Sequence, residues 1–234
     1  MYEKCKRGRC SDLEWENRTD LELELDKRIA DIMKKIEQLS AKSFKFTCGE
    51  FPPKWKAPIS EKEAAEFERE KGVKLPADYR RFITTTASAG TQPFYGLYGL
   101  LEPKPGYEFN PIVEKAFPYT LHNPLLIADL TDEEYNALYA EGAEESYIWG
   151  FILLCHEGCG MESILVLNTE DEETYGTVWF YDLSNDFGIA PLLSPKNGKP
   201  MHFLDWLEYW VDRKMGMEED DWFSFMEIVG VPDR

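Results

Sequence analysis

The first regular pattern in the chain is a stripe of apolar residues near the N-terminus. Between Thr19 and Ala41 such residues recur at spacings of four and three, as they do along one face of a helix. The stripe consists of Leu25, Ile29, Ile32, Ile36 and Leu39. Thr19 and Glu22 have the spacing of a capping box, in which each side chain bonds an unpaired backbone N–H. We predict an amphipathic helix that docks on its own domain or, alternatively, forms the seam of a dimer.

Two more helices are predicted in the next fifty residues, after Pro52, Pro53 and Pro58 interrupt the chain. Ser60 and Glu63 form a second capping-box pattern, and Gly72 is suited to end that helix at about Lys71. The following helix begins at Pro76 and ends by Gly90. Its core-facing residues are Tyr79, Phe82 and Ile83.

The middle of the chain is less regular. Aromatic, Gly and Pro residues dominate from Thr91 to Ala128, where Tyr95 to Tyr98 is predicted to be a strand and Pro103 to Pro111 a loop. Thr131 and Glu134 mark one more helix. We expect this helix to carry three residues inward, namely Tyr135, Leu138 and Tyr139.

The second half of the chain carries the strongest strand pattern. Three segments are rich in β-branched and aromatic residues: Tyr147 to Leu154, Met161 to Leu167 and Gly176 to Asp182. They predict an antiparallel meander with a hairpin turn at Gly158-Cys159-Gly160. A last helix, Met201 to Lys214, is apolar over much of its circumference, so it should cover one face of this sheet.

Length and composition indicate one folded domain with an extension. A chain of 234 residues with 43% hydrophobic and 14% aromatic residues can close one sizeable core. We predict an N-terminal extension over residues 1–50 and an α+β domain over residues 51–234.

Charge and cysteine content restrict the environment and the partners. The formal charge of −18 argues against nucleic acid and against anionic membranes, and it favours a basic protein partner. No run approaches the roughly 20 apolar residues of a spanning helix, and the basic start lacks the apolar core of a signal peptide, so we expect a cytoplasmic protein. An odd number of cysteines in this setting predicts free thiols; they are Cys5, Cys10, Cys48, Cys155 and Cys159.

The order of elements and two local motifs resemble the SUKH superfamily (Smi/Knr-like domains). The opening motif reads Ile59-Ser60-Glu61-Lys62-Glu63 and continues as Gly72-Val73-Lys74-Leu75-Pro76 into the aromatic helix. The later strands GFILLCHEGCGMESILVLNT and GTVWFYD and the helix FLDWLEYWV also match, so the resemblance covers about Ile59 to Val211. The chain departs from many members at Ser88-Ala89-Gly90, in the long segment from Gly99 to Thr131, and in the unmatched N-terminal piece.

This resemblance implies a curved antiparallel sheet packed by helices and a role as a binding module. Bacterial members are commonly immunity proteins that neutralise polymorphic toxins, often nucleases or deaminases. Other members are the SecY-interacting Syd protein and the yeast cell-wall regulators. No set of catalytic residues transfers to this chain, so the resemblance implies a non-enzymatic protein.

Candidate chemistry in the sequence is weak. Cys155, His156 and Cys159 lie close together, but their spacing is not that of a zinc knuckle, so we predict no metal and no cofactor. His156 and Glu157 could form a base with its orienting carboxylate, yet neighbours on a strand point in opposite directions. The remaining histidines, His122 and His202, are predicted to be structural.

The predicted function is binding, with two sets of residues as candidates. The acidic run Glu170, Asp171, Glu172 and Glu173 is either a solvated face or a negative surface that imitates nucleic acid and holds a basic nuclease toxin. Tyr and Trp dominate binding hot spots, and the candidates are Tyr95, Tyr98 and Tyr107, whose alternative role is packing in the core. We therefore predict an immunity protein, monomeric or weakly dimeric, that binds its toxin stoichiometrically; the alternative is a regulatory or scaffold protein.

Overall fold

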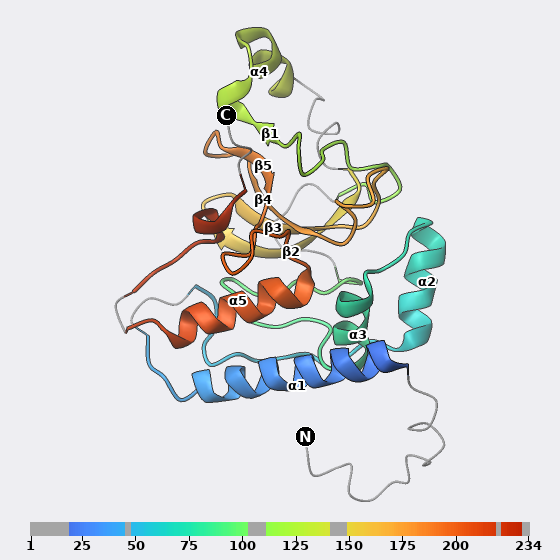
Figure 1. Cartoon of the computed structure of the whole chain (residues 1–234), viewed down its shortest axis with the longest axis vertical. Coiled ribbons are helices and arrows are strands. Elements are labelled where there is room, and N and C mark those ends of the chain that lie inside the picture. The colour runs from blue at the N-terminus through green and yellow to red at the C-terminus, as the bar shows by residue number, and fades with distance from the viewer. Residues whose placement is uncertain (1–18, 45–47, 103–110, 141–148, 219–220, 231–234) are drawn as a thin grey trace, which may run out of the picture.

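The computed structural model describes residues 19–44, 48–102, 111–140, 149–218 and 221–230. Its centre is an open, five-stranded antiparallel sheet with the strand order β1-β5-β4-β3-β2 (Figure 1). In chain order the strands are β1 Leu125–Leu126, β2 Phe151–Gly158, β3 Met161–Val166, β4 Val178–Asp182 and β5 Gly188–Pro191. The predicted α+β class and the predicted meander are confirmed, while β1 and β5 were not predicted.

The β2–β3 hairpin shows how local sequence sets the sheet geometry. Cys159 and Gly160 form its two-residue turn and both have positive φ, 54° and 82°, as the turn that matches the twist of a hairpin requires. The pairing of β2 with β3 slips at two points, between Leu153 and Cys155 and between His156 and Gly158. Such bulges bend a strand, so the sheet curves around the helix on its face.

Two helices form the layers beneath the sheet. Helix α5 (Phe203–Met215) packs on the sheet, and α1 (Asp20–Leu39) packs on α5, as Figure 1 shows. The α1 stripe is buried from Ile29 to Leu39, and the predicted Thr19–Glu22 capping box is present. The predicted amphipathic helix is therefore confirmed, and it uses its apolar face within the chain rather than as a dimer seam.

Two shorter helices complete this side of the molecule. Helix α2 (Glu61–Lys71) begins at the predicted Ser60 capping box and ends at Gly72, whose φ of 66° is left-handed. Helix α3 (Ala77–Thr85) contacts α1, α2 and α5, and it buries the three residues predicted for its core face, Tyr79, Phe82 and Ile83. Within the described ranges, no helix combines the length and the apolar character needed to cross a bilayer.

The other face of the sheet carries a second, aromatic core. Trp179 and Phe151 lie at its centre, and Phe117 packs edge-on against both rings. Phe117 comes from the irregular segment that precedes β1, so this segment covers the sheet face that the helices leave open. Because both faces are covered, the predicted strands read as continuous apolar runs rather than as alternating ones.

Two predictions about the middle of the chain are wrong. Residues Tyr95 to Tyr98 are not a strand, since Leu97 forms only isolated bridges to Gly90 and Cys155. Helix α4 (Asp132–Leu138) begins at the predicted Thr131 capping box but buries no residue, and Tyr135 and Tyr139 are 38% and 44% exposed. The 3.6-residue period identified one face of this helix, but the helix projects beyond the sheet edge, where Leu138 packs only partly against the aromatic core and the two tyrosines meet a turn.

Candidate protein-binding surface

The negative charge of the chain is concentrated in one stretch. Residues 116–195 contain 15 Asp and Glu and no Lys or Arg, whereas the rest of the chain contains 29 acidic and 26 basic residues. This stretch therefore carries −15 of the formal charge of −18. It includes all five strands, α4 and the loop between β3 and β4, so the strand half of the molecule is acidic and the helical half is nearly balanced. Counting charges in windows would have revealed this from the sequence.

The loop Asn168–Tyr175, which joins β3 to β4, holds the predicted acidic run in a fixed shape. The Asp171 carboxylate accepts hydrogen bonds from Thr174 Oγ1 at 2.6 Å and from the Glu173 backbone N–H at 3.4 Å. The Thr174 carbonyl in turn accepts a hydrogen bond from Thr177 Oγ1 at 2.6 Å. Asp171 therefore stabilises the shape of the loop, while Glu170, Glu172 and Glu173 are exposed on its surface.

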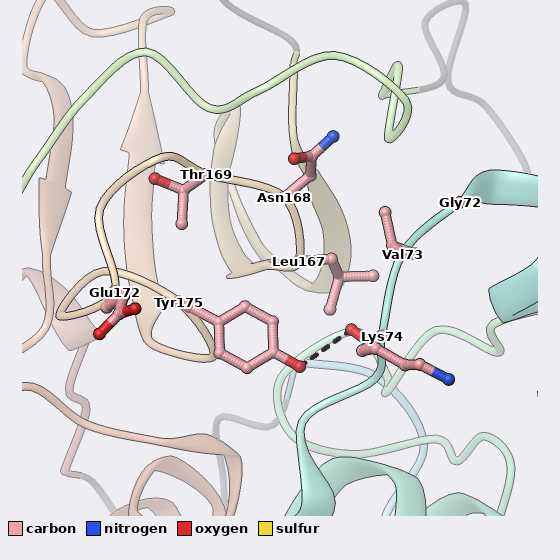
Figure 2. Close-up of a pocket in the computed structure, with 8 residues that line it drawn as sticks. All are labelled: Gly72, Val73, Lys74, Leu167, Asn168, Thr169, Glu172 and Tyr175. Carbon is pink, nitrogen blue, oxygen red and sulfur yellow. Dashed lines mark hydrogen bonds between the residues drawn. The ribbon is translucent and has the colours of Figure 1, made fainter.

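Three hollows border this loop, and each is lined by different residues of the acidic run. The first, of about 460 Å³, includes Glu172 and is drawn in Figure 2. The second, also about 460 Å³, includes Glu173, and the third, of about 530 Å³, includes Glu170 and Asp171. The loop is thus a ridge between concave surfaces, and a partner of complementary shape can contact both the ridge and the hollows.

The hollow in Figure 2 joins the acidic loop to the helical half of the molecule. Its remaining lining residues come from both parts: Gly72, Val73, Lys74, Leu167, Asn168, Thr169 and Tyr175. The Tyr175 hydroxyl donates to the Lys74 carbonyl at 3.1 Å, which ties the loop to the segment after α2. Burial raises the pKa of Tyr175, and the charges of Glu68 and Asp78 add to this, so the phenol keeps the proton that it donates.

The candidate tyrosines lie at a different place. Tyr95 is 54% exposed and packs against His156, with ring centroids 5.3 Å apart and the rings tilted by 38°. Its backbone N–H bonds the His156 carbonyl at 3.1 Å, and the Tyr98 N–H bonds the Leu154 carbonyl at 2.8 Å, so this segment covers the outer edge of β2. Tyr98 is half-buried against the aromatic core, and Tyr107 lies outside the described residues.

The structure therefore does not bring the two candidate sets together. Tyr95 lies against Gly158 at the β2–β3 turn, whereas the acidic loop follows the opposite end of β3. A six-residue strand such as β3 spans roughly 20 Å. The predicted aromatic and acidic residues form two separate patches.

Two residues considered for catalysis, Cys155 and His156, lie in β2. Cys155 is buried, and burial raises the pKa of its thiol well above the usual value. His156 contacts Glu162 on β3, with 2.7 Å between Nδ1 and Oε1, rather than its neighbour Glu157. His202 precedes α5 and its Nδ1 lies 2.8 Å from the Gly176 carbonyl, a contact that agrees with a structural role.

Metal ligands do not cluster where the structure can be described. No three His, Cys, Asp or Glu side chains of that part of the chain converge in a way that could hold an ion. Cys5 and Cys10 lie outside it. Among the other histidines, exposed His122 lies 3.9 Å from Glu173, so it borders the acidic ridge rather than the core.

Comparison with known proteins agrees with these elements. No curated protein matches the chain. The family model described as the SMI1/KNR4 family (SUKH-1) matches residues 58–196. The match begins just before α2, includes the whole sheet and the acidic ridge, and covers more than half of the sequence. The chain therefore belongs to the SMI1/KNR4 family (SUKH-1).

Proposed function

We propose that the chain is a non-enzymatic immunity protein that neutralises a basic toxin by stoichiometric binding through its acidic loop. Members of this family are known as immunity proteins or as Smi/Knr-like proteins, and SUKH domains typically bind protein partners. The observation that carries the proposal is the ridge of Glu170, Glu172 and Glu173, which lies between three hollows in a stretch without Lys or Arg.

Electrostatics explain why this surface suits a basic partner. Residues 116–195 contain no Lys or Arg, and the lysines that line two of the hollows, Lys74 and Lys199, come from other parts of the chain. Complementary charge steers association and raises its rate, while the hollows provide the contact area that makes a complex last. A nuclease that binds nucleic acid has the required positive surface, and the ridge would occupy it in place of the substrate.

The alternative is a regulatory or scaffold protein that resembles the Smi/Knr cell-wall regulators or Syd. The N-terminal basic segment and helix would favour this alternative slightly, because they add a second docking surface. The apolar stripe of α1 is buried on α5 and α3, which argues against docking by that face of the helix, and the basic segment lies outside the described residues. The acidic ridge therefore favours the immunity role.

A capture experiment with matched variants tests this proposal. The tagged chain is incubated with host lysate at ~0.1 M and ~0.5 M salt, and the retained proteins are identified by mass spectrometry. One variant carries Glu170→Gln, Glu172→Gln and Glu173→Gln. The control removes the same charge from exposed positions on α1 with Glu24→Gln, Asp31→Asn and Glu37→Gln.

The proposal predicts that one basic, toxin-like protein is retained at low salt, depleted at high salt, and lost with the loop variant but not with the α1 control. Capture of a kinase, envelope or translocon component instead would favour the regulatory alternative. Equal loss with both variants would show that net charge, rather than the ridge, holds the partner.

A further inference from the structure

Helix α4 projects from the molecule at the edge of the sheet, beyond β1 (Figure 1). A helix of seven residues is not stable alone, so contacts with the body must fix it. Leu138 packs partly against the aromatic core, and Tyr135 and Tyr139 reach the turn between β4 and β5. Within the described residues, Leu138 and the two phenols contribute to holding the helix in place.

The two tyrosines form an anchored aromatic pair. Their ring centroids are 4.9 Å apart, and both hydroxyls bond the same oxygen, Oδ1 of Asp186, at 3.2 Å from Tyr135 and 3.0 Å from Tyr139. The Tyr139 hydroxyl also lies 2.9 Å from the Leu183 carbonyl. The rings are fixed at their hydroxyl ends, yet remain 38% and 44% exposed. Because the rings are already fixed in the folded protein, a partner that binds them loses little free energy in immobilising these side chains.

The chemistry of this patch selects a cation. Aromatic faces are electron-rich, and the charge of Asp186 beside them is strong enough to raise the pKa of Tyr135. Asp132 and Glu133 on the first turn of α4 are exposed nearby, and the surrounding sequence contains no Lys or Arg. Within the described part of the chain, the second carboxylate oxygen of Asp186 accepts no hydrogen bond. A planar guanidinium can stack on a ring and bond a carboxylate at the same time, which an ammonium group does less well.

We propose that Tyr135, Tyr139 and Asp186 form a second binding site, which receives an arginine side chain of the basic protein partner. The inference rests on the proposed function for the source of that arginine. The site is separate from the acidic ridge, because the ridge precedes β4 and Asp186 follows it. Since β4 has five residues, the two sites lie roughly 17 Å apart along the strand.

A peptide titration tests the site without the natural partner. The full chain, labelled for NMR, is titrated with a capped Gly-Arg-Gly-Arg-Gly peptide and with the same peptide in which neutral citrulline replaces arginine. Asp186→Asn keeps an acceptor for the two phenols but removes the charge. Glu172→Gln removes the same charge from the ridge and is the matched control.

The expected result is that the arginine peptide, and not the citrulline peptide, shifts the ring signals of Tyr135 and Tyr139. Asp186→Asn should weaken this binding roughly fivefold, the size of an exposed guanidinium–carboxylate ion pair, and Glu172→Gln less than twofold. The inference is overturned if citrulline works equally well, if both variants weaken binding equally, or if the shifts centre on residues 168–175.

The two proposals fail separately. A captured partner that the ridge variant releases, together with no peptide shift at α4, would leave the proposed function standing and overturn this site. Peptide binding at α4 with no captured basic protein would support the site and count against the proposed function.

Discussion

Glu157 of β2 holds Ser224 of the C-terminal segment through a buried carboxylate. Its Oε2 accepts hydrogen bonds from Ser224 Oγ at 3.0 Å and from the Phe225 N–H at 3.1 Å, and its Oε1 accepts one from Ser163 Oγ at 3.1 Å. Burial raises the pKa of Glu157 to about 7, even though these bonds favour the charged form. The C-terminal segment is therefore attached to the sheet by a group that titrates near neutral pH.

This pKa predicts a pH-dependent stability. Glu157 binds its proton more tightly in the folded state, since the pKa rises from 4.5 to about 7 on folding. Its contribution is fully present below pH 4.5 and is lost as the pH rises through about 7. The variant Glu157→Gln should therefore gain stability relative to the native chain between pH 5 and pH 8, by up to about 3 kcal/mol. Urea unfolding of both proteins at pH 5 and at pH 8 measures this gain in stability. A difference in unfolding free energy that does not change with pH would contradict the raised pKa of Glu157.

The packing of α1 predicts that the N-terminal helix unfolds with the rest of the chain. Ile36 is 2% exposed, whereas Leu23 on the same helix is 46% exposed. We expect Ile36→Ala to cost about 2–4 kcal/mol, because it leaves a cavity in the shared core, and Leu23→Ala to cost less than about 0.5 kcal/mol. Thermal unfolding of both variants by circular dichroism checks this. A separate early transition in the native chain would show that α1 is only loosely attached.

Two glycines at helix ends give a matched test of backbone conformation. Gly72 ends α2 with a φ of 66°, and Gly216 ends α5 with a φ of −83°. Added Cβ atoms would find nothing within 4 Å at Gly72 and only ordinary contacts at Gly216. Gly72→Ala should therefore destabilise by about 1 kcal/mol, and Gly216→Ala should be neutral or slightly stabilising. Chemical denaturation distinguishes the two, and equal effects would contradict the left-handed assignment.

The bonds of Asp171 predict that the shape of the ridge can be changed without touching its exposed charges. Asp171→Ala removes the acceptor for Thr174 Oγ1 and for the Glu173 N–H, which should cost about 1 kcal/mol and loosen the loop. Hydrogen exchange should become faster at residues 172–174. Glu172→Ala, which removes an exposed charge, should leave that exchange unchanged; faster exchange in both variants would argue against Asp171 as the residue that orders the loop.

The elements that local sequence controls could be predicted. All three predicted capping boxes, at Thr19, Ser60 and Thr131, are present, because each depends on two side chains three residues apart. The same holds for the left-handed end of α2 at Gly72 and for the hairpin turn at Cys159 and Gly160. Their geometry is fixed within a few residues of chain.

Features that depend on distant contacts could not be predicted in this way. The contact of His156 with Glu162 depends on the register of two strands, and the exposure of Tyr135 depends on where α4 meets the sheet edge. The short strand β1 exists because Leu125 and Leu126 pair with β5, more than sixty residues later. The separation of Tyr95 from the acidic ridge follows from the direction of β3, which periodicity does not reveal.

The most direct test of the account is the association rate of the chain with its captured partner, measured by stopped flow at ~0.1 M and ~0.5 M salt. Binding through the acidic ridge predicts that the rate falls at least about tenfold at high salt, and that neutralising Glu170, Glu172 and Glu173 has a comparable effect at low salt. Neutralising Glu24, Asp31 and Glu37 on α1 should change the rate less than about twofold. A rate that does not depend on salt, or that falls equally with both triple variants, would contradict binding through the acidic ridge.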